Sequence, residues 1–240
     1  MAEVKKVMYG NTSCFFEITN QSDVIQQYHV KGEFYEANQL SHHFGLIFNG
    51  STVLDIGSNI GNHAIWYSKC SKARKVYVFE PNPVARSRLI NNVSVNQDIK
   101  GKVDFSYVNF AVGKSKSELF VGDEPLNNLG ATKMMRHSGE EGRVVVPCLS
   151  IDDLELQGKV SFVKIDVEGF EIDVLEGGDR FFSKIRPFLS IEVAWWNEIG
   201  FWHWVGDYNY HVINVFQDTD GVKNYLLVPK AVPSMRVGAK

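Results

Sequence analysis

A short segment early in the chain combines acidic, amide and glycine residues in a way that suits nucleotide binding. Residues 53–63 read VLDIGSNIGNH, so an apolar run leads to Asp55, and Gly57 and Gly61 stand on either side of Asn59. A dinucleotide site needs the spacing G-x-G-x-x-G, because its second glycine lets the backbone approach a pyrophosphate. Asn59 has a side chain at that position, and the Asp55 carboxylate disfavours a pyrophosphate. The segment therefore favours a ligand with an ammonium, a carboxylate and no phosphate.

A second acidic residue stands where the next strand is expected to end. The motif VYVFEPNP places Glu80 at 23 residues after Gly57. A carboxylate at this position can accept hydrogen bonds from both hydroxyls of a ribose. S-Adenosylmethionine fits both signals, with Asp55 attracting its ammonium and with Asn59 and N–H groups at the helix start binding its carboxylate. An NAD-dependent oxidoreductase is the alternative, since NAD sites share the glycine loop and the acid, but Asn59 and Asp55 disfavour it.

Two further carboxylates follow a later apolar run. In VSFVKIDVEGF, a strand at 160–165 delivers Asp166 to its carboxyl end, and Glu168 lies two residues on. Ligands of doubly wound sheets bind at the carboxyl ends of the strands, where strand order reverses. If the first and fourth strands are neighbours, Asp166 and Glu168 flank the glycine loop. Carboxylates in such a cleft can steer a hydroxyl or accept its proton, and Asp166 is the first candidate for the base.

Other residues are candidates for contacts with a metal ion or the substrate. Glu192, at the tip of the fifth predicted strand, could bind substrate or join Asp166 and Glu168 around a divalent ion, which is possible but not favoured because the spacing is not diagnostic. The stretch AWWNEIGFWHW at 194–204 is either an aromatic wall for a sugar or apolar acceptor or a packed connection. Within it, Trp195 and His203 are the candidate substrate contacts.

Strands alternate with helices from residue 51 onward. Apolar runs predict strands at 53–56, 75–79, 103–110, 160–165 and 187–193. Helices are predicted at 61–70, 83–96 and 170–185, the last with a break at the glycine pair 177–178. This alternation predicts an α/β fold with a mostly parallel sheet and helices on both faces. The same strand ends would then carry the glycine loop and the acidic residues.

Three segments depart from the plain dinucleotide-binding pattern. Two short strands flank a long polar loop at 122–142, in which Asn128 is a candidate substrate contact by position. Two β-rich runs around Asp-Thr-Asp-Gly, near residues 217–221, predict an antiparallel hairpin. Residues 1–50 are interpreted as an N-terminal accessory segment with a helix near 34–48, ahead of a catalytic domain at 51–240.

Six motifs together resemble the FkbM-type family of S-adenosylmethionine-dependent methyltransferases: VLDIGSNIGNH, VFEPNP, NFAVG, NNLGATKM, LSIDDL and VKIDVEGFEIDVLEGG. The resemblance covers about residues 50–193. It implies a Rossmann-like class I methyltransferase fold, an α/β fold whose mostly parallel seven-stranded sheet ends in an antiparallel hairpin. It also implies transfer of a methyl group to a hydroxyl of a small molecule, such as a sugar or a secondary metabolite.

The resemblance also assigns roles to single residues. Asp166 and Glu168 match the acidic pair of the family and are the predicted catalytic residues. Tyr35, with Glu36 beside it, is expected to close over the cofactor. The predicted contacts to the methionine part of the cofactor are Asp55, Gly57, Asn59 and Gly61. Glu80 is the predicted contact to the ribose, and Asn109 and Ala111 are those to the adenine. Further predicted cofactor contacts are Asn62, Asn82, Tyr35 and Asp166. The predicted substrate contacts are Asn128, Glu192, Trp195 and His203.

Composition limits the partners and the location. The 240 residues carry a net charge of −3 with interspersed signs, which gives no electrostatic footprint for nucleic acid or for an anionic membrane. The three cysteines are far apart, and no apolar run is long enough to span a bilayer. We therefore expect a cytoplasmic enzyme with a small-molecule acceptor, no nucleic-acid partner and no membrane insertion. A non-catalytic cofactor-binding or assembly subunit is the remaining alternative, and the oligomeric state stays open.

Overall fold

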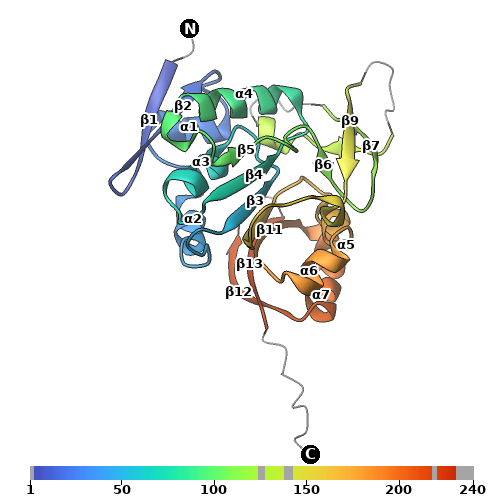
Figure 1. Ribbon diagram of the computed structural model, residues 1–240. Helices are drawn as coiled ribbons and strands as arrows, with labels where there is room; N and C mark the ends of the chain where they lie inside the picture. The colour runs from blue at the N-terminus through green and yellow to red at the C-terminus, as the bar shows by residue number, and fades with distance from the viewer. Residues whose placement is uncertain (1–2, 124–127, 138–142, 218–220, 231–240) are drawn as a thin grey trace, which may run out of the picture.

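A seven-stranded sheet forms the centre of the molecule (Figure 1). The computed structural model describes residues 3–123, 128–137, 143–217 and 221–230. The central sheet comprises β3 (Thr52–Ile56), β4 (Lys75–Phe79), β5 (Val103–Asp104), β10 (Val160–Ile165), β11 (Phe188–Ala194), β12 (Tyr210–Gln217) and β13 (Val222–Pro229). A smaller sheet comprises β6 (Ala111–Val112), β7 (Ser117–Val121), β8 (Met134–Met135) and β9 (Val145–Leu149). β1 (Glu3–Tyr9) and β2 (Thr12–Ile18) form a separate hairpin.

The central sheet is mixed. Its strand order is β12-β13-β11-β10-β3-β4-β5, and the neighbouring strands from β11 to β5 run parallel. β13 lies between β11 and β12 and is antiparallel to both. The predicted antiparallel hairpin therefore forms between β12 and β13, although its turn residues 218–220 lie outside the described residues. The chain passes from β3 to β4 on one side and returns to β10 on the other, so strand order reverses at β3.

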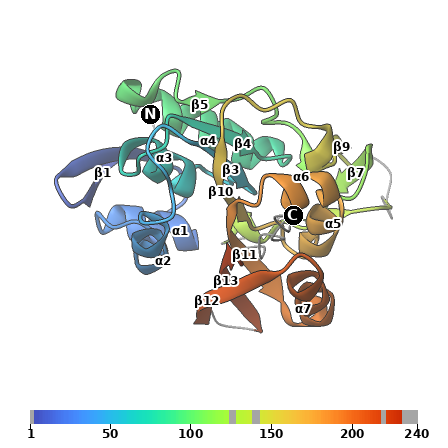
Figure 2. The same ribbon diagram turned by 60° about the horizontal axis from the view of Figure 1, so that its bottom comes forward.

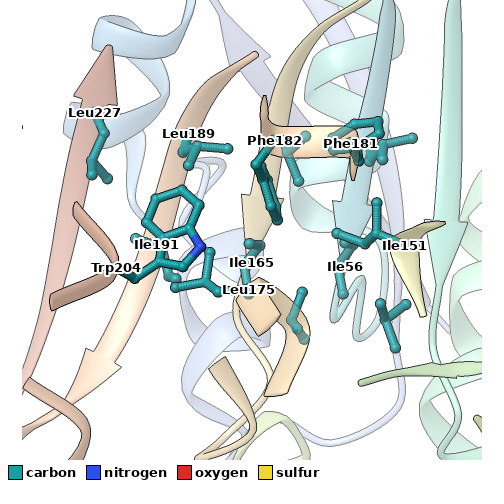
Figure 3. Packing of buried hydrophobic residues seen from close by; sticks show 14 of the residues in the cluster. Ile56, Ile151, Ile165, Leu175, Phe181, Phe182, Leu189, Ile191, Trp204 and Leu227 are labelled. Atoms are coloured by element: carbon teal, nitrogen blue, oxygen red, sulfur yellow. The ribbon is translucent and has the colours of Figure 1, made fainter. Parts of the chain in front are cut away.

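Alternate residues of the central strands pack on opposite faces of the sheet, as the two-residue period of a strand requires. On one face, Leu54 and Val163 join a core that helices α5, α6 and α7 cover. Trp204 of α7 lies beside Leu189 and Ile191 of β11 in this core (Figure 3). The helices on this side are α5 (Glu171–Glu176), α6 (Asp179–Lys184) and α7 (Glu198–Asp207).

The opposite face packs against the earlier part of the chain. Val53 and Phe162 belong to a second core, together with residues of α3, α4 and the N-terminal segment. Figure 2 shows α1, α2 and the β1–β2 hairpin gathered beside α3. The helices on this side are α1 (Val24–Val30), α2 (Ala37–His43), α3 (Asn62–Lys69) and α4 (Pro83–Ser94). The N-terminal segment thus contributes to the core of the main sheet.

Most predicted elements occur with small shifts of their ends, and two differ. The strand expected over 103–110 ends at Asp104, because the Asp104 carboxylate accepts hydrogen bonds from the backbone N–H and hydroxyl of Ser106 and turns the chain. The helix expected near 34–48 is confined to α2, because the preceding residue Glu36 has left-handed backbone angles. Among the helices that the structure describes, none combines the length and apolarity needed to cross a bilayer.

Candidate active site

One cavity of about 640 Å³ lies at the carboxyl ends of β3, β4, β10 and β11. It lies at the reversal of strand order, where ligands of doubly wound sheets bind. Predicted site residues that line it are Tyr35, Gly57, Asn59, Glu80, Asn82, Ala111, Asn128, Asp166, Glu168 and Glu192. They come from the ends of four strands of the central sheet, from β6, from the long loop and from the N-terminal segment.

The glycine loop is bonded to the tip of β4. The backbone N–H groups of Gly57 and Ser58 both donate to the carbonyl of Phe79, at 3.0 and 2.9 Å. Gly57 has a φ of 81°, and a side chain there would overlap the backbone oxygen of Asp166. This position therefore needs glycine both for its backbone angles and for its close approach to the end of β10.

Glu80 is buried at the tip of β4 and its carboxylate orders the loops around it. Its Oε2 accepts a hydrogen bond from the Asn59 backbone N–H at 2.7 Å, and its Oε1 accepts from that of Asn82 at 2.9 Å. Burial raises the pKa of Glu80 to about 7, although these two hydrogen bonds oppose the shift. A carboxylate oxygen has about two acceptor sites, so each oxygen retains one for a ligand.

Lys164 lies beneath the cavity between two carboxylates. Its Nζ is 2.9 Å from Asp166 Oδ2 and 3.8 Å from Asp55 Oδ1, and it donates to the Gly57 carbonyl at 2.7 Å. Burial opposes the charge on Lys164, but Asp166 and Asp55 outweigh it and raise the Lys164 pKa. Burial would also raise the pKa of Asp166, yet Lys164 lowers it below its usual value. Lys164 therefore keeps Asp166 ionised and fixes the end of β10 to the glycine loop.

Three carboxylates of the cavity gather near the carboxyl ends of β10 and β11. Asp166, Glu168 and Glu192 each offer an oxygen, and these oxygens lie within 4.8 Å of one another. Burial, followed by the charge of Asp166, raises the pKa of Glu168 to about 8. Burial raises the pKa of Glu192 well above its usual value, and the charges of Asp166 and Glu168 add to the shift. The cluster therefore holds one ionised group and two that keep their protons to higher pH.

The N-terminal segment forms one wall of the cavity through Tyr35 and Glu36. Glu36 adopts a φ of 57°, which is unfavourable for a residue with a side chain and is common at functional sites. Its carboxylate accepts from Gln39 Nε2 at 2.9 Å and lies 3.1 Å from His63 Nε2. His63 belongs to α3, so its contact holds the wall against this helix, which begins directly after the glycine loop.

The structure places six other predicted site residues outside the cavity lining. Asp55 is fully buried behind Gly57, where burial raises its pKa against the opposing charge of Lys164. Gly61 packs against Leu89, and Asn62 bonds to His29 and to the Tyr35 carbonyl. The others are Asn109, which precedes the lining residues Phe110 and Ala111, and Trp195 and His203, which are exposed.

Sequence reasoning assigned no role to Lys164, and none to the single residues of Leu129–Thr132, which form part of the lining and lie within the motif NNLGATKM. Lys164 had a usable signal, because a single charged residue within an apolar strand is expected to have an ionic partner. For the 129–132 segment, the motif indicated the family resemblance but not which of its residues face the cavity. Its position is set by contacts from distant parts of the chain, including a hydrogen bond of 3.3 Å from the Leu129 N–H to Asp23 Oδ2.

The strand order and the site at its reversal define a Rossmann-like class I methyltransferase fold. The structure is similar to that of methyltransferase FkbM from Methylobacillus flagellatus KT, with a TM-score of 0.55 and 18% identity over 76% of this chain and 45% of that one. It is also similar to a Streptococcus pneumoniae protein assigned as a tRNA methyltransferase and solved with S-adenosyl-L-methionine, with a TM-score of 0.52 and 13% identity over 80% and 72% of the two chains. At these identities the likeness establishes the fold.

The chain belongs to the methyltransferase FkbM domain family, whose sequence model matches residues 55–224. Among curated proteins, it is 31% identical over 142 residues to hexuronic acid methyltransferase AglP of Haloferax volcanii, covering 58% of this chain and 54% of that one. It is 27% identical over 149 residues to 2-O-methyltransferase NoeI of Sinorhizobium fredii, covering 56% and 60% of the two chains. The chain thus spans between half and two thirds of the length of these relatives.

Proposed function

We propose that this protein transfers a methyl group from S-adenosylmethionine to a hydroxyl of a sugar. The observation that carries the proposal is the cavity itself, which is lined by Glu80 and by the carboxylates of Asp166, Glu168 and Glu192. Its volume of about 640 Å³ lies within the range of about 300–1,000 Å³ that is typical of small-molecule sites. A ribose acceptor and a cluster of carboxylates in one cavity suit a nucleoside cofactor beside a hydroxyl substrate.

The residues present fit S-adenosylmethionine. Glu80 has free acceptor sites for the two ribose hydroxyls. Within the described part of the chain, the buried Oδ1 of Asn59 has no hydrogen-bond partner, as expected of a group that meets a donor on a ligand. Asp166, held ionised by Lys164, would face the cationic part of the cofactor. When bound, this cofactor supplies an electrophilic methyl group on a sulfonium centre.

Glu168 is the base that the electrostatics favour. A general base works best when its pKa lies near the working pH, and the pKa of Glu168 is about 8. The pKa of Asp166 is lowered by Lys164, so its carboxylate is the weaker base and is better suited to orienting the hydroxyl. In the transfer, the acceptor oxygen forms a bond to the methyl carbon, the carbon–sulfur bond breaks with its electron pair going to sulfur, and Glu168 takes the hydroxyl proton.

The sugar acceptor is proposed from the relatives, whose names specify a hexuronic acid and a 2-O position. These relatives and the similar structures named above are methyltransferases, so they give no support to an oxidoreductase. A divalent ion stays the less favoured alternative, because the Lys164 ammonium already lies 2.9 Å from Asp166 and would repel it. A small-molecule acceptor rather than a nucleic acid remains a prediction.

The test is transfer of an isotopically labelled methyl group from S-adenosylmethionine to a panel of neutral and acidic monosaccharide glycosides, followed by mass spectrometry. We expect a labelled methyl ether on a sugar hydroxyl. Glu168→Gln should lower turnover by about 10²–10⁴-fold, whereas the exposed Glu118→Gln should retain it. A labelled amine, a labelled carboxyl ester or an unlabelled panel would contradict the proposal, and full turnover of Glu168→Gln would reject Glu168 as the base.

A further inference from the structure

The surface of the molecule carries a strip of large apolar side chains beside the cavity. Trp195 and Trp196 lie in η4 (Trp195–Asn197), and Ile199 and Trp202 follow in α7. Their exposed fractions are 67%, 50%, 75% and 46%. Positions 199 and 202 are three residues apart, which places them on one face of α7, and Trp195 and Trp196 directly precede this helix. We call Trp195, Trp196, Ile199 and Trp202 the tryptophan strip.

The strip is not explained by packing within the protein. α7 already has an inward face, on which Phe201, Trp204 and Val205 are buried. A surface helix with one buried face normally has polar residues on the other. Here the outward face exposes Ile199 and Trp202 instead. Contiguous exposed apolar side chains on a protein surface commonly mark a binding site.

The strip begins at the rim of the cavity. Trp196 packs against Gly169, whose neighbours Glu168 and Phe170 both line the cavity. The Lys133 ammonium lies 5.1 Å from the Trp196 ring centre, and the residues on either side of Lys133 also line the cavity. The strip therefore continues the cavity from its acidic side outward along α7.

On the other side of the strip, Trp195 is joined to the β12–β13 hairpin. The backbone N–H of Trp195 donates to the Gly221 carbonyl at 2.9 Å, and the residue after Gly221, Val222, lines the cavity. Trp195 and Trp196 thus each adjoin a different part of the rim. A molecule that leaves the cavity on this side would meet both rings.

We propose that the tryptophan strip binds a hydrocarbon tail on the acceptor, so that the substrate is an amphipathic glycoside whose sugar enters the cavity. This inference rests on the proposed function. The sugar would place its hydroxyl beside Glu168, and the tail would leave past Trp196 and lie along Ile199 and Trp202. Burying these side chains and the tail removes apolar surface from water, which favours binding.

Two other occupants fit the strip less well. A stable protein interface uses about 20–30 residues on each side, whereas the strip has four. Helices that lie on membranes have polar faces rich in lysine and arginine, whereas α7 has neither and instead carries Glu198 and Asp207. A hydrocarbon tail of a small amphipathic molecule needs only a few apolar side chains and no basic residues, as on this surface.

The test compares methyl glucoside with octyl glucoside, each below micelle-forming concentration, by calorimetric titration of the S-adenosylhomocysteine-loaded protein. We expect octyl glucoside to bind at least about tenfold more tightly. Ile199→Gln and Trp202→Gln should each reduce the affinity for octyl glucoside about three- to tenfold, in proportion to the lost apolar contact. Ile90→Gln on α4 is the matched control, because Ile90 is 44% exposed and α4 lies at the opposite end of the molecule from α7 in Figure 1.

Several results would overturn the inference. Equal affinities for the two glucosides, or octyl glucoside binding that Ile199→Gln leaves unchanged, would reject a tail site. Binding to phosphatidylcholine vesicles that Ile199→Gln abolishes, without a preference for the dispersed octyl compound, would assign the strip to a membrane surface. A dimer that dissociates in Ile199→Gln, seen by sedimentation, would assign it to a second copy of the chain. If S-adenosylhomocysteine fails to bind, the titrations are repeated without it. A preference for octyl glucoside would then support the tail site on the tryptophan strip and reject the proposed function.

Discussion

At the scale of single residues, Glu80 shows how surroundings set the chemistry of one carboxylate. Burial raises its pKa to about 7, while the N–H groups of Asn59 and Asn82 hold it in one orientation. A carboxylate that binds two ribose hydroxyls must be ionised, because the protonated acid offers fewer acceptor sites. Cofactor affinity should therefore depend on pH near neutrality.

The first prediction concerns the pH dependence of cofactor binding. Because the pKa of Glu80 is about 7, the group is mostly ionised at pH 8 and mostly protonated at pH 6. We expect affinity for S-adenosylhomocysteine to fall by up to about tenfold from pH 8 to pH 6. Glu80→Gln should bind more weakly by about 1.5–3 kcal/mol at pH 8 and lose this part of the pH dependence.

Calorimetry at several pH values checks this prediction, with Glu118→Gln as the control that should behave like the wild type. Glu168 also titrates in this range, because burial raises its pKa to about 8. The quantity to compare is therefore the difference in the pH dependence of ligand affinity between wild type and Glu80→Gln. Identical pH profiles for wild type and Glu80→Gln would remove Glu80 from the cofactor site.

At the scale of elements, Asn92 of α4 and Asn96, two residues beyond the end of this helix, bind the edge of the N-terminal hairpin. Asn92 Oδ1 accepts from the Glu17 N–H at 2.8 Å, and Asn96 bonds both backbone groups of Phe15. Asn96 Nδ2 also donates to the Asn92 carbonyl at 2.7 Å, so the two residues are directly bonded. Asn92 Nδ2 also donates to the Ile60 carbonyl at 2.8 Å, which connects the hairpin to the glycine loop.

The second prediction is that Asn92→Ala lowers the free energy of unfolding by about 1–3 kcal/mol, because it leaves a buried N–H and carbonyl without partners. Asn91 precedes it on the same helix and is exposed, so Asn91→Ala should change stability by less than about 0.5 kcal/mol. Urea denaturation of both variants gives the comparison. Equal stabilities would show that Asn92 does not hold the hairpin.

Elements with strong local signals could be predicted from the sequence. The buried apolar runs predicted β4 and β10 at their observed positions. The glycine pair predicted the break between α5 and α6. The β1–β2 hairpin was not predicted, although the Gly10-Asn11 pair at its turn is a hairpin signal. The end of β5 was misplaced because a turn at Asp104 outweighs the β-rich residues that follow it.

At the scale of the whole molecule, the cavity is assembled from segments that are far apart in sequence. Residues at strand ends could be predicted to meet, because the topology brings the carboxyl ends of parallel strands together. Glu80, Asp166, Glu168 and Glu192 accordingly share the cavity. The burial of Asp55 behind Lys164 could not be read from the sequence, since it depends on how neighbouring strands and the glycine loop pack. Nor could the sequence predict which side chains of the aromatic stretch at 194–204 are buried and which are exposed.

The most direct test of the account is calorimetric titration of the wild-type protein with S-adenosylmethionine, S-adenosylhomocysteine and NAD in parallel. The cavity is proposed to hold a nucleoside with an amino-acid group rather than a dinucleotide, because Asn59 occupies the place where a pyrophosphate would need glycine. We predict that the first two ligands bind with similar affinity and that NAD does not bind. Binding of NAD alone, or of none of the three, would contradict the methyltransferase function proposed for this chain.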